Sequence, residues 1–135
     1  MKKLFFLISI MIVFSSCEKE AGEGGTSTIS GKIMYFTTSY NQQTSTNDTT
    51  YYPKAGKDIY IIYGDDENEI YDDNFETDWN GNFHFQYLRK GEYTLYTYVD
   101  SVAVNNVTYD YPVFKHVTIS ENNSFNIVTD FVIQN

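Results

Sequence analysis

Apolar side chains recur at every second position through most of this 135-residue chain. The alternation is clear from Ile29 to Tyr35, where the polar residues Ser30 and Lys32 separate the apolar ones. Beyond residue 16, no window places apolar residues at the three- and four-residue spacing of a helix. A chain of alternating strands buries its apolar faces by packing two sheets together. We therefore predict an all-β fold, a single β-sandwich of about seven or eight strands.

The inward-facing positions of these strands form the predicted core. They are Ile29, Ile33, Ile59, Ile61, Phe83, Phe85, Leu88, Tyr93, Leu95, Val117, Ile119 and Phe125. The alternation breaks after Phe85, because Leu88 and Tyr93 do not continue its parity. This break predicts either a β-bulge or a crossing between sheets. The polar segment 37–53 is long for a connection in a compact domain, so we expect it to be mobile or functional.

The N-terminus has the anatomy of an export signal. Lys2 and Lys3 precede an apolar run from Leu4 to Phe14, broken only by Ser9. As a helix this run reaches roughly 16 Å, about half of a bilayer's hydrocarbon core. A positively charged start followed by so short an apolar run predicts a secretory signal and not a spanning helix.

Ser15 and Ser16 lead directly into Cys17, the only cysteine of the chain. This arrangement resembles a bacterial lipoprotein signal, in which the cysteine is acylated and becomes the first residue. The resemblance implies a signal peptide over 1–16, a lipidated flexible tether over 17–26 and a sandwich domain over 27–135. Each buried methylene contributes about 0.8 kcal/mol, so several acyl chains, such as palmitate, hold a protein on a membrane. We expect an outer-membrane lipoprotein of the cell envelope, with the membrane as its partner.

The acidic, glycine-rich residues 18–25 follow this cysteine. One interpretation is a flexible spacer between the membrane and the domain. The other is surface display, because the segment looks like the export signal of surface lipoproteins in the Bacteroidetes group. Both the periplasmic and the surface location stay open at this point.

The charge of the chain excludes one class of partner. It contains 9 basic and 18 acidic residues, a formal net charge of −9. Residues 1–16 include two of the lysines and none of the acids, so their removal leaves −11. Such a surface repels phosphate backbones, and we expect no nucleic-acid partner.

One continuous stretch, from Thr77 to Leu95, reads TDWNGNFHFQYLRKGEYTL. It resembles the carboxypeptidase regulatory-like domain, a transthyretin-like member of the prealbumin-like sandwich group. The shared turn and core motif comprises Asp78, Gly81, Phe83, Phe85, Leu88, Gly91 and Tyr93. The resemblance implies a non-catalytic accessory or binding module. Two features depart from the family pattern: the longer segment 37–53, and Arg89 and Lys90 where relatives often have proline.

The motif residues also have a physical role in a turn. The Asp78 carboxylate can accept a hydrogen bond from the backbone two residues on, and Gly81 allows the positive φ that ends the turn. Gly91 does the same before Tyr93, whose ring is large enough to close an edge of the sandwich. These residues specify a fold and are no catalytic site.

Acidic side chains are concentrated in residues 65–78, and calcium is the cation they suggest. The stretch from Glu76 to Gly81 is similar to the start of a calcium loop, but Tyr87 stands where the loop needs an acid. We favour a solvated acidic loop and expect no metal and no cofactor.

No motif with a catalytic mechanism is present. The single cysteine is assigned to lipid, and His84 and His116 lie on strands, facing away from the apolar positions, without zinc-ligand spacing. We expect exposed histidines and no enzymatic activity. An isopeptide bond from Lys32 to Asn126 or Asn135, as in collagen-adhesin repeats, is a further alternative, although no core acid is evident to assist it.

Tyrosine is in excess, with 13 residues. Tyr60, Tyr96 and Tyr98 lie on the strand faces opposite the predicted core, while Tyr40, Tyr51 and Tyr52 lie in the segment 37–53. Amphipathic rings contact sugars and proteins well, although tyrosine also simply suits the outer face of a sheet. The sequence thus predicts a binding or accessory module for glycan or protein partners. The alternative is a structural subunit, or adhesin-like component, of a surface assembly.

Overall fold

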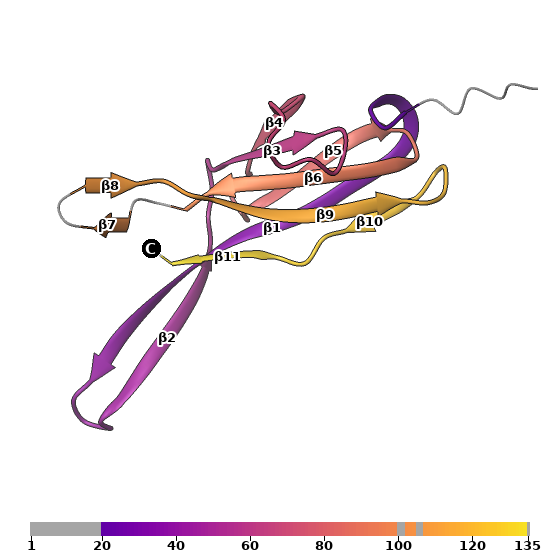
Figure 1. Cartoon of the computed structure of the whole chain (residues 1–135). Coiled ribbons are helices and arrows are strands. Elements are labelled where there is room, and N and C mark those ends of the chain that lie inside the picture. Colours follow the sequence, from indigo (N-terminus) through magenta and orange to yellow (C-terminus); the bar gives the residue numbers. More distant parts are fainter. Residues whose placement is uncertain (1–19, 100–101, 105–106, 135) are drawn as a thin grey trace, which may run out of the picture.

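The computed structural model describes residues 20–99, 102–104 and 107–134, and over these residues the chain is an all-β sandwich without helices (Figure 1). The predicted all-β sandwich is thereby confirmed. The predicted signal peptide 1–16 and Cys17 lie outside the described residues. In the part of the chain that is described, no helix is long and apolar enough to cross a membrane.

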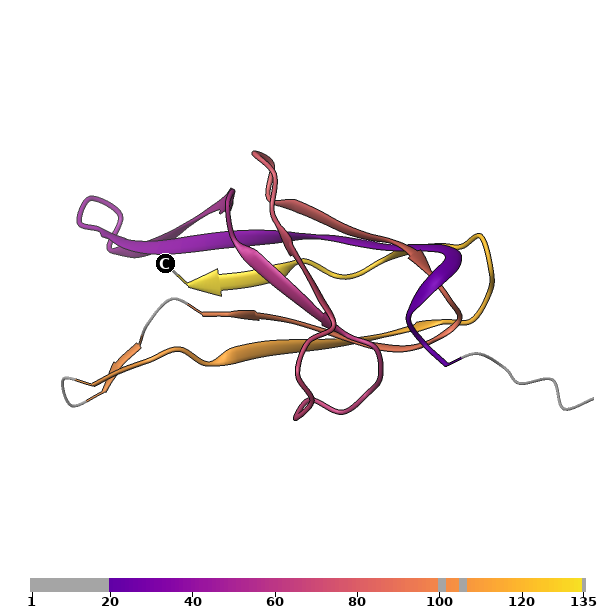
Figure 2. The same ribbon diagram turned by 90° about the horizontal axis from the view of Figure 1, so that it is seen from above.

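Two sheets form the layers of the sandwich. The five-stranded sheet consists of β1 (Glu23–Asn41), β2 (Thr46–Pro53), β5 (Asn82–Leu88), β10 (Phe125–Ile127) and β11 (Phe131–Gln134). The four-stranded sheet has the order β4 (Asp73–Glu76), β3 (Asp58–Ile62), β6 (Gly91–Tyr98) and β9 (Pro112–Ile119). A separate hairpin joins β7 (Val102–Val104) to β8 (Val107–Tyr109). Figure 2 shows the indigo-to-purple β1 in one layer and the orange β9 in the other.

Strand β1 is the central strand of the first sheet, and the other four strands all pair with it. It pairs antiparallel with β5 and then with β2 along one edge, and Ile33 bonds across to both Gly81 and Lys54. Along the other edge it pairs in parallel with β10 and then with β11. The strand starts at Glu23, inside the segment 17–26 for which the sequence predicts a tether. The sandwich therefore includes residues that the sequence assigns to the tether.

The segment 37–53 is a β-hairpin and not the irregular connection that its length predicts. Residues from Met34 to Asn41 pair with those from Thr46 to Pro53 in continuous register. Most side chains of this hairpin are exposed on both faces. Because no face is buried, the sequence shows no apolar alternation here, although the backbone forms strands. This hairpin and β7–β8 account for strands beyond the predicted seven or eight.

A β-bulge explains the broken alternation between Phe85 and Leu88. Both Glu23 and Ser27 pair with Leu88, so the register shifts between β1 and β5. Tyr87 takes a left-handed conformation with φ of 59° and points to solvent, which returns Leu88 to the interior. The bulge accounts for Leu88, and the crossing of the chain from β5 in the first sheet to β6 in the second accounts for Tyr93, so both predicted explanations apply.

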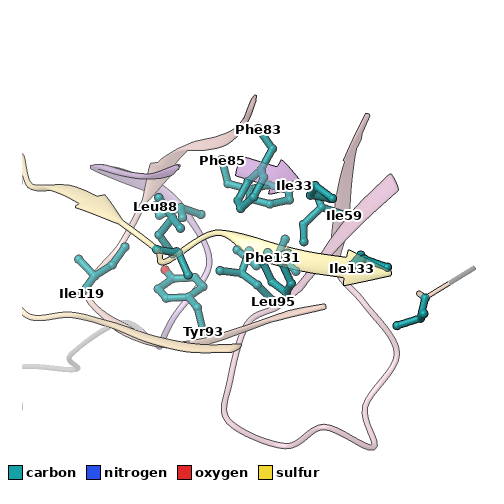
Figure 3. Packing of buried hydrophobic residues seen from close by; sticks show 14 of the residues in the cluster. Ile33, Ile59, Phe83, Phe85, Leu88, Tyr93, Leu95, Ile119, Phe131 and Ile133 are labelled. Atoms are coloured by element: carbon teal, nitrogen blue, oxygen red, sulfur yellow. The ribbon is translucent and has the colours of Figure 1, made fainter. Parts of the chain in front are cut away.

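The core lies between the two sheets, where the labelled side chains gather in Figure 3. Ten of the predicted core residues are fully buried, but Val117 is only half-buried and Phe125 is 67% exposed. Strand β10 turns Asn126 inward instead, so the assignment of Phe125 to the core is wrong. The core residues that the sequence analysis missed are Tyr35, Val99, Val128, Phe131 and Ile133.

The sandwich has two distinct ends. In both views the β1–β2 hairpin and the β7–β8 hairpin project from one end, and the indigo start of the described chain lies at the other (Figures 1 and 2). Strand β6 runs between them: Tyr93 contacts Gly22, and Tyr98 lies five residues further on, roughly 17 Å away.

Candidate binding surface

The turn between β4 and β5 is built around Asp78. Its carboxylate accepts hydrogen bonds from the backbone N–H groups of Asn80 and Asn82, both at 2.8 Å, and from the Asn82 side chain at 3.1 Å. These bonds, those from Asn82 first, hold the pKa of the Asp78 carboxyl below its usual range. Gly81 follows with φ of 73°, and a Cβ there would lie 2.5 Å from the Ile33 oxygen. Asp78 and Gly81 therefore serve to form the turn.

Tyr93 joins the start of the described chain to the second sheet. Its hydroxyl donates to the Arg89 oxygen at 2.7 Å and accepts from the Gly22 N–H at 2.9 Å. This is the geometry of a tyrosine corner. The Arg89 N–H donates to the Gly22 oxygen at 2.9 Å, a bond that a proline at this position could not make. A Cβ at Gly91 would meet Ala21 at 2.7 Å, so the close packing here also needs glycine.

An aromatic cluster covers the outer face of the second sheet. We call it the tyrosine face; it consists of Tyr60, Tyr71, Tyr96, Tyr98 and Phe114. The rings of Tyr60 and Tyr96 are stacked at 5.0 Å, and Tyr71 and Tyr98 approach Tyr60 at 4.8 and 6.0 Å. Phe114 continues the cluster at 5.3 Å from Tyr96. Burial is the main cause that raises the pKa of both Tyr60 and Tyr96. Tyr71 and Tyr98 remain 45% and 40% exposed, so the cluster presents two open rings.

A polar hollow of about 390 Å³ adjoins this face where β3 begins and β6 ends. We call it the end hollow. Tyr60 and Tyr98 line it together with charged groups of both signs. The other lining residues are Lys54, Gly56, Lys57, Asp58 and Asp110. Aromatic rings beside hydrogen-bond donors and acceptors are the composition of a site for a small amphipathic ligand.

The segment 65–78 does not bring its acids together around a cation site. Asp66 accepts from the backbone and side chain of Asn68, and Asp72 from the Tyr63 N–H at 2.6 Å. Within the described ranges, no three His, Cys, Asp or Glu side chains are arranged to hold a metal ion.

Both histidines are exposed on their strands, as the alternation predicts. His84 packs beside Phe75, with ring centroids 4.7 Å apart. The His116 ring contacts Glu67 through Nε2 and Thr94 through Nδ1, each at 3.0 Å. The His116 contacts tie the 65–78 loop to the sheet.

Among the groups named for an isopeptide bond, the Asn126 side chain has other partners. The Asn126 amide donates to the Thr28 oxygen and the Ser124 hydroxyl, while Lys32 lines an outer-face hollow with Asp78. Asn135 lies outside the described residues. The buried polar side chains of the described chain are Ser27, Thr77, Thr94 and Thr97, and none of them is an acid.

The tyrosines of the hairpin do not join the tyrosine face. Tyr40 and Tyr51 are exposed on the projecting arm, and Tyr51 lies 6.0 Å from Phe36. Tyr52 is half-buried and packs against Tyr35 at 6.1 Å. Sequence reasoning identified the outward tyrosines of β3 and β6 but missed Tyr71, Phe114 and the lysines of the end hollow.

No model of a known protein family matches the chain, and no curated protein matches it either. Among solved structures, it is similar to a "putative carbohydrate binding protein" from Pseudomonas aeruginosa. The two are 16% identical, the alignment covers 85% of this chain and 92% of that one, and the TM-score is 0.47. A similarity at this level says nothing about the ligand of this chain.

Proposed function

We propose that this chain is a lipid-anchored envelope protein whose sandwich is a non-catalytic module that binds neutral glycans. The observation that carries the proposal is the tyrosine face, which opens onto the end hollow. The resemblance of residues 77–95 to carboxypeptidase regulatory-like domains supports a binding role as well. The anchor itself rests on the sequence around Cys17.

The chemistry of this surface favours a sugar over other ligands. The C–H face of a sugar ring stacks on exposed tyrosine rings such as those of Tyr71 and Tyr98. Its hydroxyl groups can donate to Asp58 and accept from Lys54 at the wall of the end hollow. The formal charge of −9 disfavours polyanionic ligands, so we infer a neutral glycan.

The position of the end hollow fits an anchored protein. Cys17 precedes by three residues the point where the described chain begins, and Tyr98 lies at the far end of β6 from there. A lipid on Cys17 would thus leave the end hollow directed away from the bilayer.

Binding can be tested on a glycan array with the full-length protein in a detergent that has no sugar headgroup. We expect neutral glycans to bind, and Tyr98→Ala to weaken binding at least ~10-fold, about 1.4 kcal/mol. The matched control is Tyr40→Ala on the hairpin, which should bind as the wild type does. Failure to bind any neutral glycan, or equal affinity of Tyr98→Ala and wild type, would overturn the glycan proposal.

Anchoring needs a separate test. In cells, the wild type should fractionate with the membrane, whereas Cys17→Ser should not be acylated and should leave the membrane fraction. A Cys17→Ser protein that still carries lipid or stays in the membrane would contradict the proposed anchor.

A structural role in a surface assembly is the second candidate. It is favoured by Phe125 and Ile127, which are 67% and 77% exposed on the short edge strand β10. Neighbouring exposed apolar side chains favour association with another chain. Sedimentation should then show self-association that a Phe125→Ser, Ile127→Ser double variant removes.

A further inference from the structure

Trp79 is the most exposed large apolar side chain of the described residues. Its side chain is 90% exposed, at the turn between β4 and β5. Tryptophan is usually largely buried, since its indole carries a large apolar surface. It is also the only tryptophan of the chain.

The backbone that carries Trp79 is held rigidly. Thr77 bonds to the neighbouring loop through four hydrogen bonds. Its hydroxyl donates to the Lys54 oxygen at 2.6 Å and accepts from the Lys57 N–H at 2.9 Å. Its backbone pairs with Gly56 and Lys57 at 2.9 and 3.0 Å. On the other side, the Asp78 carboxylate fixes the turn. A rigid turn loses little conformational entropy when its exposed ring contacts a ligand.

A second hollow, of about 480 Å³, lies beside the indole. We call it the Trp hollow; its lining residues are Ala55, Gly56, Glu76, Thr77, Asp78 and Trp79. Gly56 lines the end hollow too, so the two hollows adjoin. Gly56 has φ of 66°, and a Cβ there would lie 3.5 Å from Glu76 Oε1.

Strand register shows how the two hollows continue one another. Glu76 on β4 is the partner of Asp58 on β3, and both side chains share the outer face with Tyr60. Tyr98 follows on the next strand, β6. Two inter-strand spacings, ~10 Å, therefore separate Glu76 from Tyr98, and Trp79 lies beyond Glu76. The row is longer than a single sugar ring.

We infer that Trp79 is a second stacking platform for the same ligand, which is an extended neutral oligosaccharide and not a single terminal sugar. The inference rests on the proposed function, since it extends the surface proposed there. In this arrangement one unit of the chain stacks on Tyr98 and a later unit on the indole. Between them, Asp58 and Glu76 accept hydrogen bonds from sugar hydroxyls.

The lone indole makes the test specific, because the intrinsic tryptophan fluorescence reports Trp79 alone. The probes are cello-, laminari-, xylo- and manno-hexaose together with the corresponding disaccharides. They are titrated into the full-length protein by calorimetry and by fluorescence. We expect a bound hexaose to change the emission. We also expect Trp79→Ala to lose about 10-fold of the hexaose affinity while its disaccharide affinity stays unchanged.

The matched variants separate the two proposals. Tyr98→Ala should weaken hexaose and disaccharide alike, and Tyr40→Ala should weaken neither. If a hexaose binds by calorimetry but leaves the emission unchanged, or binds Trp79→Ala as it binds the wild type, the Trp79 inference is wrong and the glycan module stands. If none of the probes binds, the glycan proposal fails and this inference fails with it. Circular dichroism of each variant checks that the fold is retained.

Discussion

The hydroxyl of the buried Tyr93 donates a hydrogen bond to the Arg89 carbonyl oxygen, four residues earlier, at 2.7 Å. The Tyr93 hydroxyl oxygen in turn accepts a hydrogen bond from the Gly22 N–H, so one phenol joins the β5–β6 turn to the segment that leads into β1. This segment is thereby part of the fold.

Replacing Tyr93 by Phe should destabilise the protein by about 1–3 kcal/mol, because it leaves a buried N–H and a buried C=O without their partner. Urea unfolding measures the difference, with Tyr40→Phe on the exposed hairpin as the control. An unfolding midpoint equal to that of the wild type would show that the phenol bonds contribute nothing net.

Gly31 leaves room for the ring of Phe83. A Cβ at position 31 would lie 2.6 Å from Phe83 Cζ, so Gly31→Ala should cost about 1–3 kcal/mol through overpacking. In a Phe83→Leu background, where the side chain at position 83 is smaller, Gly31→Ala should lower the free energy of unfolding by less than it does in the wild type. Additive losses in this cycle would contradict the proposed contact.

Asp78 should make the free energy of unfolding depend on pH in the acidic range. Its pKa is lowered in the folded state, so its contribution is present above the unfolded pKa of ~3.9 and is lost as pH falls through the lower folded pKa. Asp78→Asn should therefore be less stable than the wild type at neutral pH, and the gap should close below about pH 4. Urea unfolding at several pH values tests this, and Asp65→Asn on the exposed loop is the control. A gap that stays constant with pH would assign the effect to shape and not to charge.

Tyr63 should make the free energy of unfolding depend on pH in the alkaline range. Burial is the main cause that raises its pKa to about 12, well above the ordinary value of a tyrosine. The neutral form is thus favoured in the fold, and this stability is complete below pH ~10 and is lost as pH rises toward 12. Tyrosinate absorbance of the folded protein should show a late step that Tyr63→Phe reduces. Identical titration curves for the two proteins would contradict this assignment.

The strands that bury one face were predictable from the sequence, because alternation at residues such as Ile29 and Ile33 follows directly from burial. The β1–β2 hairpin was not, since its side chains are solvated on both faces and its pairing is set by the backbone alone. The prediction that Phe125 belongs to the core failed for a related reason. An apolar residue on an edge strand alternates as a core residue does, and only the pairing with β1 shows that Asn126 points inward.

The tyrosine face was partly predictable. Parity identified Tyr60, Tyr96 and Tyr98 as outward, but it could not show that a loop brings Tyr71 onto Tyr60. The adjoining hollows depend on the hydrogen bonds between Thr77 and the Lys54–Lys57 loop, more than 20 residues away in sequence. Contacts of this kind leave no periodic signal in the chain.

The parallel pairing of β1 with β10 and β11 constrains the order in which the protein can mature. Its earliest strand acquires the neighbours on one edge only when nearly the whole polypeptide is present. Until residues 125–134 emerge from the ribosome, that edge has no partner, and folding is delayed.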